Sequence, residues 1–201
     1  MYWRLIPIFI LAVFVLVTSG HSSVNTVGWA LLNEGSYYVV LVRHADAPGN
    51  GDPDSFRLDD CSTQRNLSER GRDEARALGA VFRERGIRVA KVVTSRWCRA
   101  LETAELMEVG KVEPEPAFDN LRFNERRNND LTELARTFIG SWHGPGVLIA
   151  VTHDSNLKAL TGVDAAQSGV VLVSPAERGM RFRPLVLVPP TGGYRRGHLV
   201  E

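Results

Sequence analysis

The sequence of 201 residues has little excess charge and only two cysteines. Its 24 Lys and Arg residues against 23 Asp and Glu residues leave a formal net charge of +1. Without a strongly basic balance, the composition does not predict nucleic acid as a partner. A hydrophobic fraction of 44% and a charged fraction of 23% are ordinary for a globular protein, and the length suits one domain better than two.

The sequence also lacks the short motifs that mark several common cofactor sites. It contains neither the G-x-x-x-x-G-K-[ST] phosphate loop nor a G-x-G-x-x-G turn after a strand. Its five His and two Cys residues do not have the spacing of a metal site, and no internal repeat is present. We therefore expect no metal and no cofactor.

The one strongly biased stretch lies at the N-terminus. Arg4 supplies a positive charge, Leu5 to Val17 is apolar except for Pro7, and small polar residues follow. This order is typical of a secretory signal, and the apolar run is shorter than the ~20 residues of a spanning helix. We expect residues 1–20 to be a signal peptide or, because no clean A-x-A site is present, an N-terminal membrane anchor. The protein is therefore expected to be exported, periplasmic or extracellular.

Apolar, β-branched runs alternate with helical patterns in the rest of the chain. Strands are predicted at 38–42, 89–94, 147–151, 170–173 and 182–188. Helices are predicted at 68–86, 100–109, 131–142 and 156–160. The alternation predicts a three-layer α/β/α domain with a mostly parallel central sheet over 37–190, after a lead-in at 21–36 and before a flexible tail at 191–201.

Some details of this prediction can be tested directly. Ser68 is expected to cap the first helix and Gly86 to end it. Leu134 is assigned to the core stripe of the third helix, and Pro114 is expected to break regular structure. Residues 47–64, rich in Gly, Pro, Asp and Ser, are expected to form a long functional loop.

Residues suited to phosphate chemistry stand at three predicted strand ends. Arg43 and His44 follow the first strand, Arg99 follows the second, and His153 follows the third. Ligands of open α/β sheets bind at the carboxyl ends of the strands, so these side chains can converge. Arg forms bidentate contacts with phosphate, and a neutral His can attack phosphorus covalently. The pattern favours phosphoryl transfer over a purely structural role for these residues.

Four ordered motifs resemble those of the histidine phosphatase, or phosphoglycerate mutase-like, superfamily. Leu41-Val42-Arg43-His44 resembles its L-V-R-H signature, and residues 66–71 resemble its x-L-[ST]-x-x-G segment. Residues 94–104 resemble S-x-x-x-R-A-x-[QE]-T-A, and residues 151–153 resemble V-[GT]-H. The resemblance extends from about residue 39 to about residue 173, and it implies a phosphoglycerate mutase-like fold.

The resemblance also implies roles for individual residues. His44 is the expected nucleophile and becomes phosphohistidine, while Arg43, Arg99 and His153 bind the phosphoryl group. The position of the arginine within the third motif selects Arg99, and Arg96 is placed at the rim. The implied activity is that of a metal-independent phosphomonoester hydrolase, acting on a small-molecule or envelope phosphate ester.

One departure from the family pattern concerns the proton for the leaving group. Phe123 stands where many members carry a catalytic Glu, which argues against mutase activity. Asp154, directly after the second histidine, is the first candidate for the acid, and Asp119 and Glu125 are weaker ones. Asp154 is also suited to capping the helix that follows it.

Export would place the two cysteines in an oxidising compartment. Cys61 and Cys98 are then a candidate disulfide that fastens the long loop beside Arg99, although two separate buried thiols are the alternative. Two alternative functions stay open as well. The Arg-His-Ala-Asp-Ala stretch at 43–47 is similar to short phosphohistidine protein phosphatases, and the missing Glu is compatible with a phosphate-binding pseudophosphatase.

Overall fold

The computed structural model describes residues 28–33, 37–123, 128–175, 182 and 184–187. A six-stranded sheet has the order β3-β2-β4-β1-β5-β6. Its strands are β1 (Val39–Arg43), β2 (Val89–Thr94), β3 (Val112–Pro114), β4 (Val147–Thr152), β5 (Val170–Val173) and β6 (Leu185–Leu187). Neighbouring strands from β3 to β1 are parallel, and β5 is antiparallel to both β1 and β6. The prediction of a mostly parallel sheet is confirmed.

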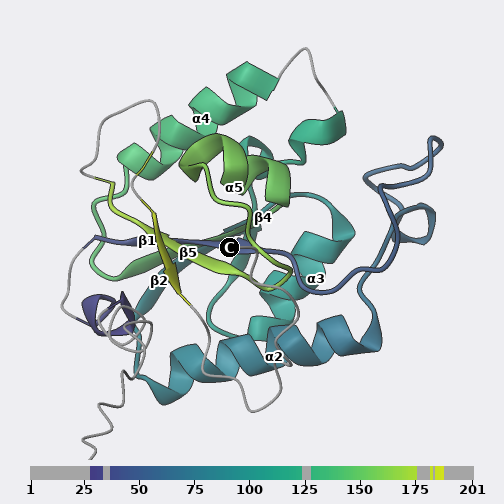
Figure 1. The fold of residues 1–201 in the computed structure, drawn as a ribbon. Helices are drawn as coiled ribbons and strands as arrows, with labels where there is room; N and C mark the ends of the chain where they lie inside the picture. Colours follow the sequence, from purple (N-terminus) through teal and green to yellow (C-terminus); the bar gives the residue numbers. More distant parts are fainter. Residues whose placement is uncertain (1–27, 34–36, 124–127, 176–181, 183, 188–201) are drawn as a thin grey trace, which may run out of the picture.

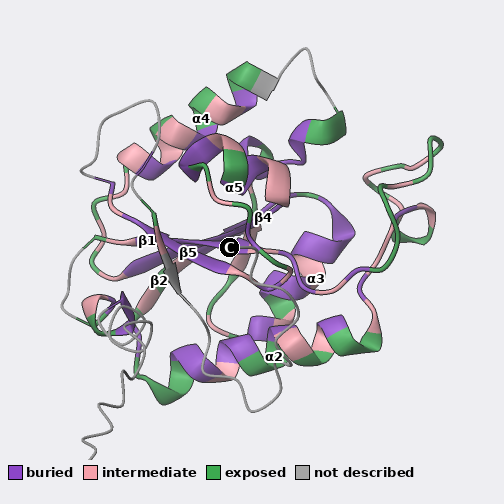
Figure 2. Cartoon of the chain, in the orientation of Figure 1, coloured by how far each residue is buried: buried purple, intermediate pink, exposed green. Residues whose placement is uncertain are grey.

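Helices cover both faces of this sheet (Figure 1). The helices α2 (Glu69–Glu84) and α3 (Cys98–Met107) lie on one face, and α4 (Asn128–Gly140) and α5 (Asp154–Thr161) lie on the other. Successive side chains of β1 alternate between the two cores, because neighbouring residues of a strand point to opposite faces. The buried strands therefore occupy the centre of the molecule (Figure 2). The expected three-layer α/β/α arrangement is confirmed.

The ends of α2 follow the sequence signals closely. The hydroxyl of Ser68 accepts a hydrogen bond from the backbone N–H of Gly71, as an N-cap does. After the last turn, Gly86 adopts a left-handed backbone with φ of +64°. Within the helix, a Cβ on Gly79 would lie 1.8 Å from the backbone oxygen of Met107, so α2 and α3 pack with their backbones in contact.

Several element boundaries differ from the prediction. Pro114 does not interrupt regular structure, because it ends the short edge strand β3, where the missing N–H of proline is tolerated. Helix α3 begins two residues earlier than predicted, and β6 covers only the middle of 182–188. Helix α4 begins and ends earlier than predicted. Residues 47–64 form a loop as predicted, with one short 3-10 turn at Cys61–Thr63.

The prediction for Leu134 is wrong. Its side chain is 54% exposed, whereas Leu131, Ala135 and Ile139 are buried. The core stripe of α4 thus follows a spacing of four residues rather than three. Leu134 fits the i, i+3 spacing of an apolar helix face, but it lies beside the buried stripe and does not face the sheet.

The stretch set aside as a lead-in also contributes to the core. Trp29 and Leu32 are buried in the cluster shared by α2 and α3. The ring of Trp29 meets that of Phe82 edge to face, with centroids 5.4 Å apart. The expected signal or anchor at 1–20 and the tail at 191–201 lie outside the described residues. No helix among the described residues is long and apolar enough to cross a membrane.

Candidate functional site

The two histidines singled out in the sequence meet at the carboxyl end of the sheet. His44 follows β1 and His153 follows the adjacent strand β4. Their rings are 5.4 Å apart between centroids, and both side chains are almost completely buried. The backbone N–H of His44 donates to the carbonyl of Thr152, which holds the two strand ends together. The structure therefore brings these two predicted site residues into contact.

The ring of His44 is held in a form suited to nucleophilic attack. Its Nδ1 lies 2.8 Å from the carbonyl oxygen of Ala45, which can only accept, so Nδ1 carries the proton. The lone pair then belongs to Nε2. Burial, together with the charge of Arg99 and smaller contributions from two other arginines, lowers the pKa of His44 to about 3. The imidazole is therefore neutral and nucleophilic at neutral pH.

Arg99 lies in the first turn of α3 and is fixed by a buried carboxylate. Its Nη1 donates to both carboxylate oxygens of Asp52, at 2.8 and 3.0 Å, and both side chains are almost fully buried. Asp52 also accepts from the indole N–H of Trp97 and the backbone N–H of Arg65. Burial lowers the pKa of Arg99 to about 10, so its charge persists at neutral pH. The long loop thus supplies the residue that orients this arginine.

Arg43 and Arg65 are the two further cations that lower the pKa of His44. Arg43 donates to the carbonyl oxygen of Ala165 at 2.8 Å. Arg65 donates to the carbonyl oxygen of Ala47 in the long loop. The buried Nε atoms of Arg43, Arg65 and Arg99 have no hydrogen-bonding partner within the described part of the chain. Three guanidinium groups around one neutral histidine are suited to an anion with several oxygens.

The second histidine is oriented by a serine from the third motif. Nε2 of His153 lies 2.8 Å from the hydroxyl of Ser95, which lies farther, at 3.5 Å, from Asp119. The Ser95 hydroxyl has one proton, which it can donate to Asp119 while it accepts from Nε2 or donate to Nε2 itself, so the tautomer of His153 sets the direction of this contact. The buried Nδ1 of His153 has no partner among the described residues. Burial lowers the pKa of His153 well below its usual value, with His44 as the next cause.

Asp154 is the first residue of α5, and His153 occupies the N-cap position. The suggestion that Asp154 is the N-cap is therefore wrong by one residue. Its Oδ1 accepts from the backbone N–H of Ser155, and its Oδ2 accepts from Arg122 at 2.8 Å and lies 3.7 Å from Arg43. Asp154 lies at the edge of the cluster, with both oxygens engaged.

The two weaker candidates for the acid are Asp119 and Glu125. Asp119 is buried, and its carboxylate accepts hydrogen bonds from the backbone N–H and from the guanidinium group of Arg96. Arg96 is half exposed in this ion pair, which agrees with a place at the rim. Glu125 lies outside the described residues. Phe123 is partly exposed and packs against other aromatic rings.

Other residues of the motifs hold the loops around the site. The backbone N–H of Ala45 donates to the hydroxyl of Thr103, which itself donates to the carbonyl of Arg99. These bonds tie the residue after His44 to α3. At Gly71, a Cβ would lie 2.1 Å from the backbone oxygen of Asp46, so only glycine fits there. The motif residues that carry no chemistry therefore have a packing role.

Cys61 and Cys98 form a disulfide, as expected. The bond joins the long loop to the first residue of α3, directly before Arg99. The backbone N–H of Cys98 also donates to the side chain of Gln64. A cross-link that closes a segment of this length contributes about 2–4 kcal/mol to stability in small proteins. It also keeps the loop that carries Asp52 beside the arginine that Asp52 orients.

Sequence reasoning missed two residues of the site. Arg65 stands directly before the second motif and next to the long loop, and this position could have marked it as a candidate site residue. Asp52 had no comparable signal, because it is one of several acidic residues in an irregular loop. Its role depends on a contact across 47 positions of sequence.

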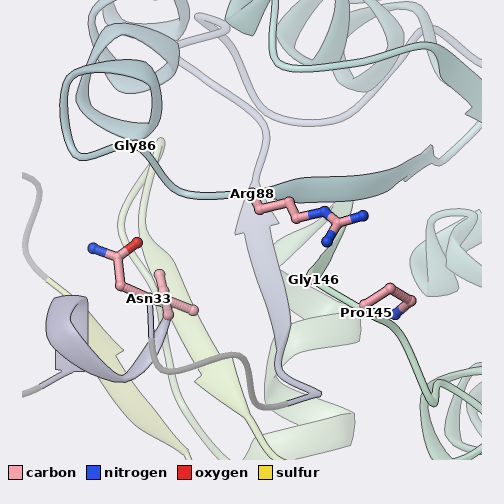
Figure 3. A pocket seen from close by; sticks show the side chains of 6 residues that line it. Asn33, Gly86, Arg88, Pro145 and Gly146 are labelled. Carbon is pink, nitrogen blue, oxygen red and sulfur yellow. The ribbon is translucent and has the colours of Figure 1, made fainter.

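A hollow elsewhere in the molecule does not belong to this site (Figure 3). It is lined by Leu32, Asn33, Gly86, Arg88, Pro145 and Gly146. Arg88 and Gly146 directly precede β2 and β4, so the hollow lies at the opposite end of the sheet from His44. Among the described residues, no group of three or more His, Cys, Asp or Glu side chains is arranged to hold a metal ion.

Comparisons with solved structures reveal the same fold in several phosphatases. The protein assigned as the phosphohistidine phosphatase SixA from Agrobacterium tumefaciens is 20% identical, with a TM-score of 0.54 over 76% of this chain and 98% of that one. The protein assigned as an alpha-ribazole-5'-P phosphatase from Escherichia coli K-12 is 14% identical, with a TM-score of 0.58 over 80% of this chain and 100% of that one. These likenesses support the phosphoglycerate mutase-like fold.

A match to a family model shows family membership, which structural likeness at this low sequence identity does not show. No curated protein gives a significant match to the sequence. The model described as histidine phosphatase superfamily, branch 1, matches residues 39–161, which contain the residues assembled at the carboxyl end of the sheet. This match covers more than half of the chain, and it starts with β1 and ends with α5. The chain therefore belongs to the histidine phosphatase superfamily.

Proposed function

We propose that this protein is a metal-independent phosphomonoester hydrolase that acts through a phosphohistidine on His44. The observation that carries the proposal is the neutral ring of His44, with its Nε2 lone pair free, beside the guanidinium groups of Arg43, Arg65 and Arg99. The phosphatases with the same fold support hydrolysis as the reaction class. The buried Nδ1 of His153 has no partner among the described residues, and in the tautomer that places the proton there it can donate to a phosphoryl oxygen.

The reaction proceeds in two displacements. Nε2 of His44 attacks phosphorus, the P–O ester bond breaks, and the leaving oxygen takes a proton. The phosphorylated imidazole carries a positive charge, which the carbonyl oxygen of Ala45 stabilises through Nδ1–H. Water then attacks phosphorus, the P–N bond breaks, and inorganic phosphate leaves. The arginines offset the charge on the phosphoryl oxygens in both steps.

The leaving-group proton is assigned to Asp154 or to water. Asp154 lies next to Arg43, at the edge of the proposed phosphoryl site. Both oxygens of Asp154 accept hydrogen bonds. To donate a proton as an acid, the carboxyl group must therefore first break its hydrogen bond with Arg122 or with the backbone N–H of Ser155. This requirement favours substrates whose leaving group needs little help from a proton donor.

The test is direct capture of the intermediate. Purified protein mixed with an aryl phosphate in the presence of EDTA is expected to release phosphate. Acid-labile phosphate should appear on the peptide that contains His44, by rapid quenching and mass spectrometry. The exposed His143 in the same digest is the internal control. Phosphate release without label on His44, or release abolished by EDTA, would contradict the mechanism. Binding of phosphate by a folded protein without turnover would support the pseudophosphatase alternative.

A second candidate is a phosphohistidine protein phosphatase. The proteins described as SixA, one of them complexed with tungstate, share this fold with TM-scores of 0.54 and 0.51. Turnover of a phosphorylated histidine protein at a far higher kcat/KM than an aryl phosphate would favour this alternative. Both functions use the same nucleophile and the same arginines.

We propose further that the protein is exported and that its substrate is a small-molecule or envelope phosphate ester. The disulfide supports export, because such bonds persist mainly in oxidising compartments. We expect cell fractionation to find the protein outside the cytoplasm. Alkylation of whole cells before lysis should leave Cys61 and Cys98 unlabelled. Protein with free thiols in the cytoplasmic fraction would contradict this proposal.

A further inference from the structure

Three aromatic rings form a cluster beside the histidine pair. Phe56 comes from the long loop, Trp97 precedes α3, and Phe123 ends the 3-10 turn at Leu121–Phe123. The ring centroids of Phe56 and Phe123 are 4.5 Å apart, and each is 5.6 Å from that of Trp97. Trp97 in turn lies 5.7 Å from His153, edge to face. The cluster is therefore continuous with the site through one ring contact.

The outer part of this cluster is apolar and open to solvent. Phe123 is 37% exposed and Phe56 is half-buried, whereas Trp97 is 4% exposed. The only polar atom of the three rings, the indole Nε1 of Trp97, already donates to Asp52 at 3.0 Å. The rings can therefore offer a ligand contact area and ring faces but no hydrogen bond. This surface matches a flat apolar ring better than a hydroxyl-rich group such as a sugar.

The carboxylates around the site also favour a substrate whose leaving group contains an aromatic ring. Asp52, Asp119 and Asp154 each accept from donors with both of their oxygens. A leaving group of low basicity suits a site whose carboxylates are engaged in this way. A phenol, with a pKa of about 10, is a far better leaving group than an aliphatic alcohol.

We propose that the substrate is an aryl phosphate monoester whose ring packs on Phe123 and Phe56 while its phosphoryl group is held between His44, His153 and the arginines. The inference rests on the proposed function, since it places the leaving group relative to the phosphoryl site. It adds the chemical class of the leaving group and two residues that determine specificity. Phe56 belongs to the loop that also carries Asp52, so one loop serves both parts of the substrate.

The test compares two phosphonates that cannot be hydrolysed. Benzylphosphonate carries a CH2 group in place of the ester oxygen, and methylphosphonate lacks the ring. In calorimetry with the full protein, benzylphosphonate is expected to bind about two- to tenfold more tightly. In Phe123→Ala the difference should nearly disappear, while the affinity for methylphosphonate stays within about twofold. Phe123→Leu removes the ring but keeps an apolar side chain, so it tests the ring in a variant that is less prone to unfold. Leu134→Ala removes an exposed apolar side chain on α4, away from the aromatic cluster, and serves as the matched control.

The outcomes separate the two proposals. If neither phosphonate binds, the phosphoryl site and the proposed function are wrong. If both bind with equal affinity, or if the preference for benzylphosphonate survives in both Phe123 variants, the aromatic subsite is wrong and the phosphoryl site stands. A loss of both affinities in folded Phe123→Ala would overturn the subsite as well, because the ring would then serve the phosphoryl site and not the leaving group.

Discussion

A His44→Ala variant is expected to lose phosphate release from an aryl phosphate by about four orders of magnitude or more. The reason is that Nε2 of His44 forms the covalent intermediate on which both displacements depend. Removal of this nucleophile leaves only substrate binding and charge stabilisation. The size of the effect distinguishes a nucleophile from a binding residue. Loss of one charge-stabilising donor typically reduces kcat by only about 10²–10³-fold.

The measurement is kcat/KM at several pH values, together with the affinity for inorganic phosphate. Arg43, Arg99 and His153 remain in the variant, so phosphate should still bind. The matched control is His143→Ala, which removes an exposed imidazole far along the chain and should leave kcat/KM unchanged. Residual activity in His44→Ala above about one hundredth of the wild-type value would show that another group attacks phosphorus.

Much of this site could be predicted because its residues follow strands. The buried β-branched runs at 39–43 and 147–152 are adjacent parallel strands in the sheet. Their carboxyl ends must therefore meet, and His44 and His153 meet with them. Ser68 and Gly86 could be assigned as helix ends because capping depends on local backbone geometry. In both cases, the decisive interaction is short in sequence or imposed by the sheet.

The parts that escaped prediction depend on contacts between distant segments. Asp52 becomes part of the site only because the loop folds back onto α3, where it meets Arg99 and Trp97. Leu134 satisfies a helical pattern, but α4 turns a neighbouring face toward the sheet. Nothing local distinguishes Asp52 from the other acidic residues of the loop, nor Leu134 from its buried neighbours.

Lowering the pH from 7 to 5 is expected to reduce the free energy of unfolding by about 2 kcal/mol through the buried His44 alone. In the unfolded chain, a histidine takes up a proton below pH ~6.5, whereas native His44 stays neutral until about pH 3. The unfolded state then binds more protons, so stability falls as pH falls. For His44 the window is pH 6.5 to about 3. His153, whose pKa is also well below its usual value, adds a loss of the same sign that begins at the same upper limit.

Urea denaturation at pH 7, 6 and 5, with the disulfide intact, measures this dependence. His44 is expected to contribute about 2 kcal/mol over these two pH units, because a full proton difference amounts to ~1.4 kcal/mol per unit. In His44→Gln, which cannot take up a proton, about 2 kcal/mol of the pH dependence should disappear. A wild-type free energy of unfolding that stayed constant between pH 7 and 5 would mean that the native histidines titrate like those of the unfolded chain. His44 would then be largely protonated in mild acid, and its assignment as a neutral nucleophile held among three arginines would fail there.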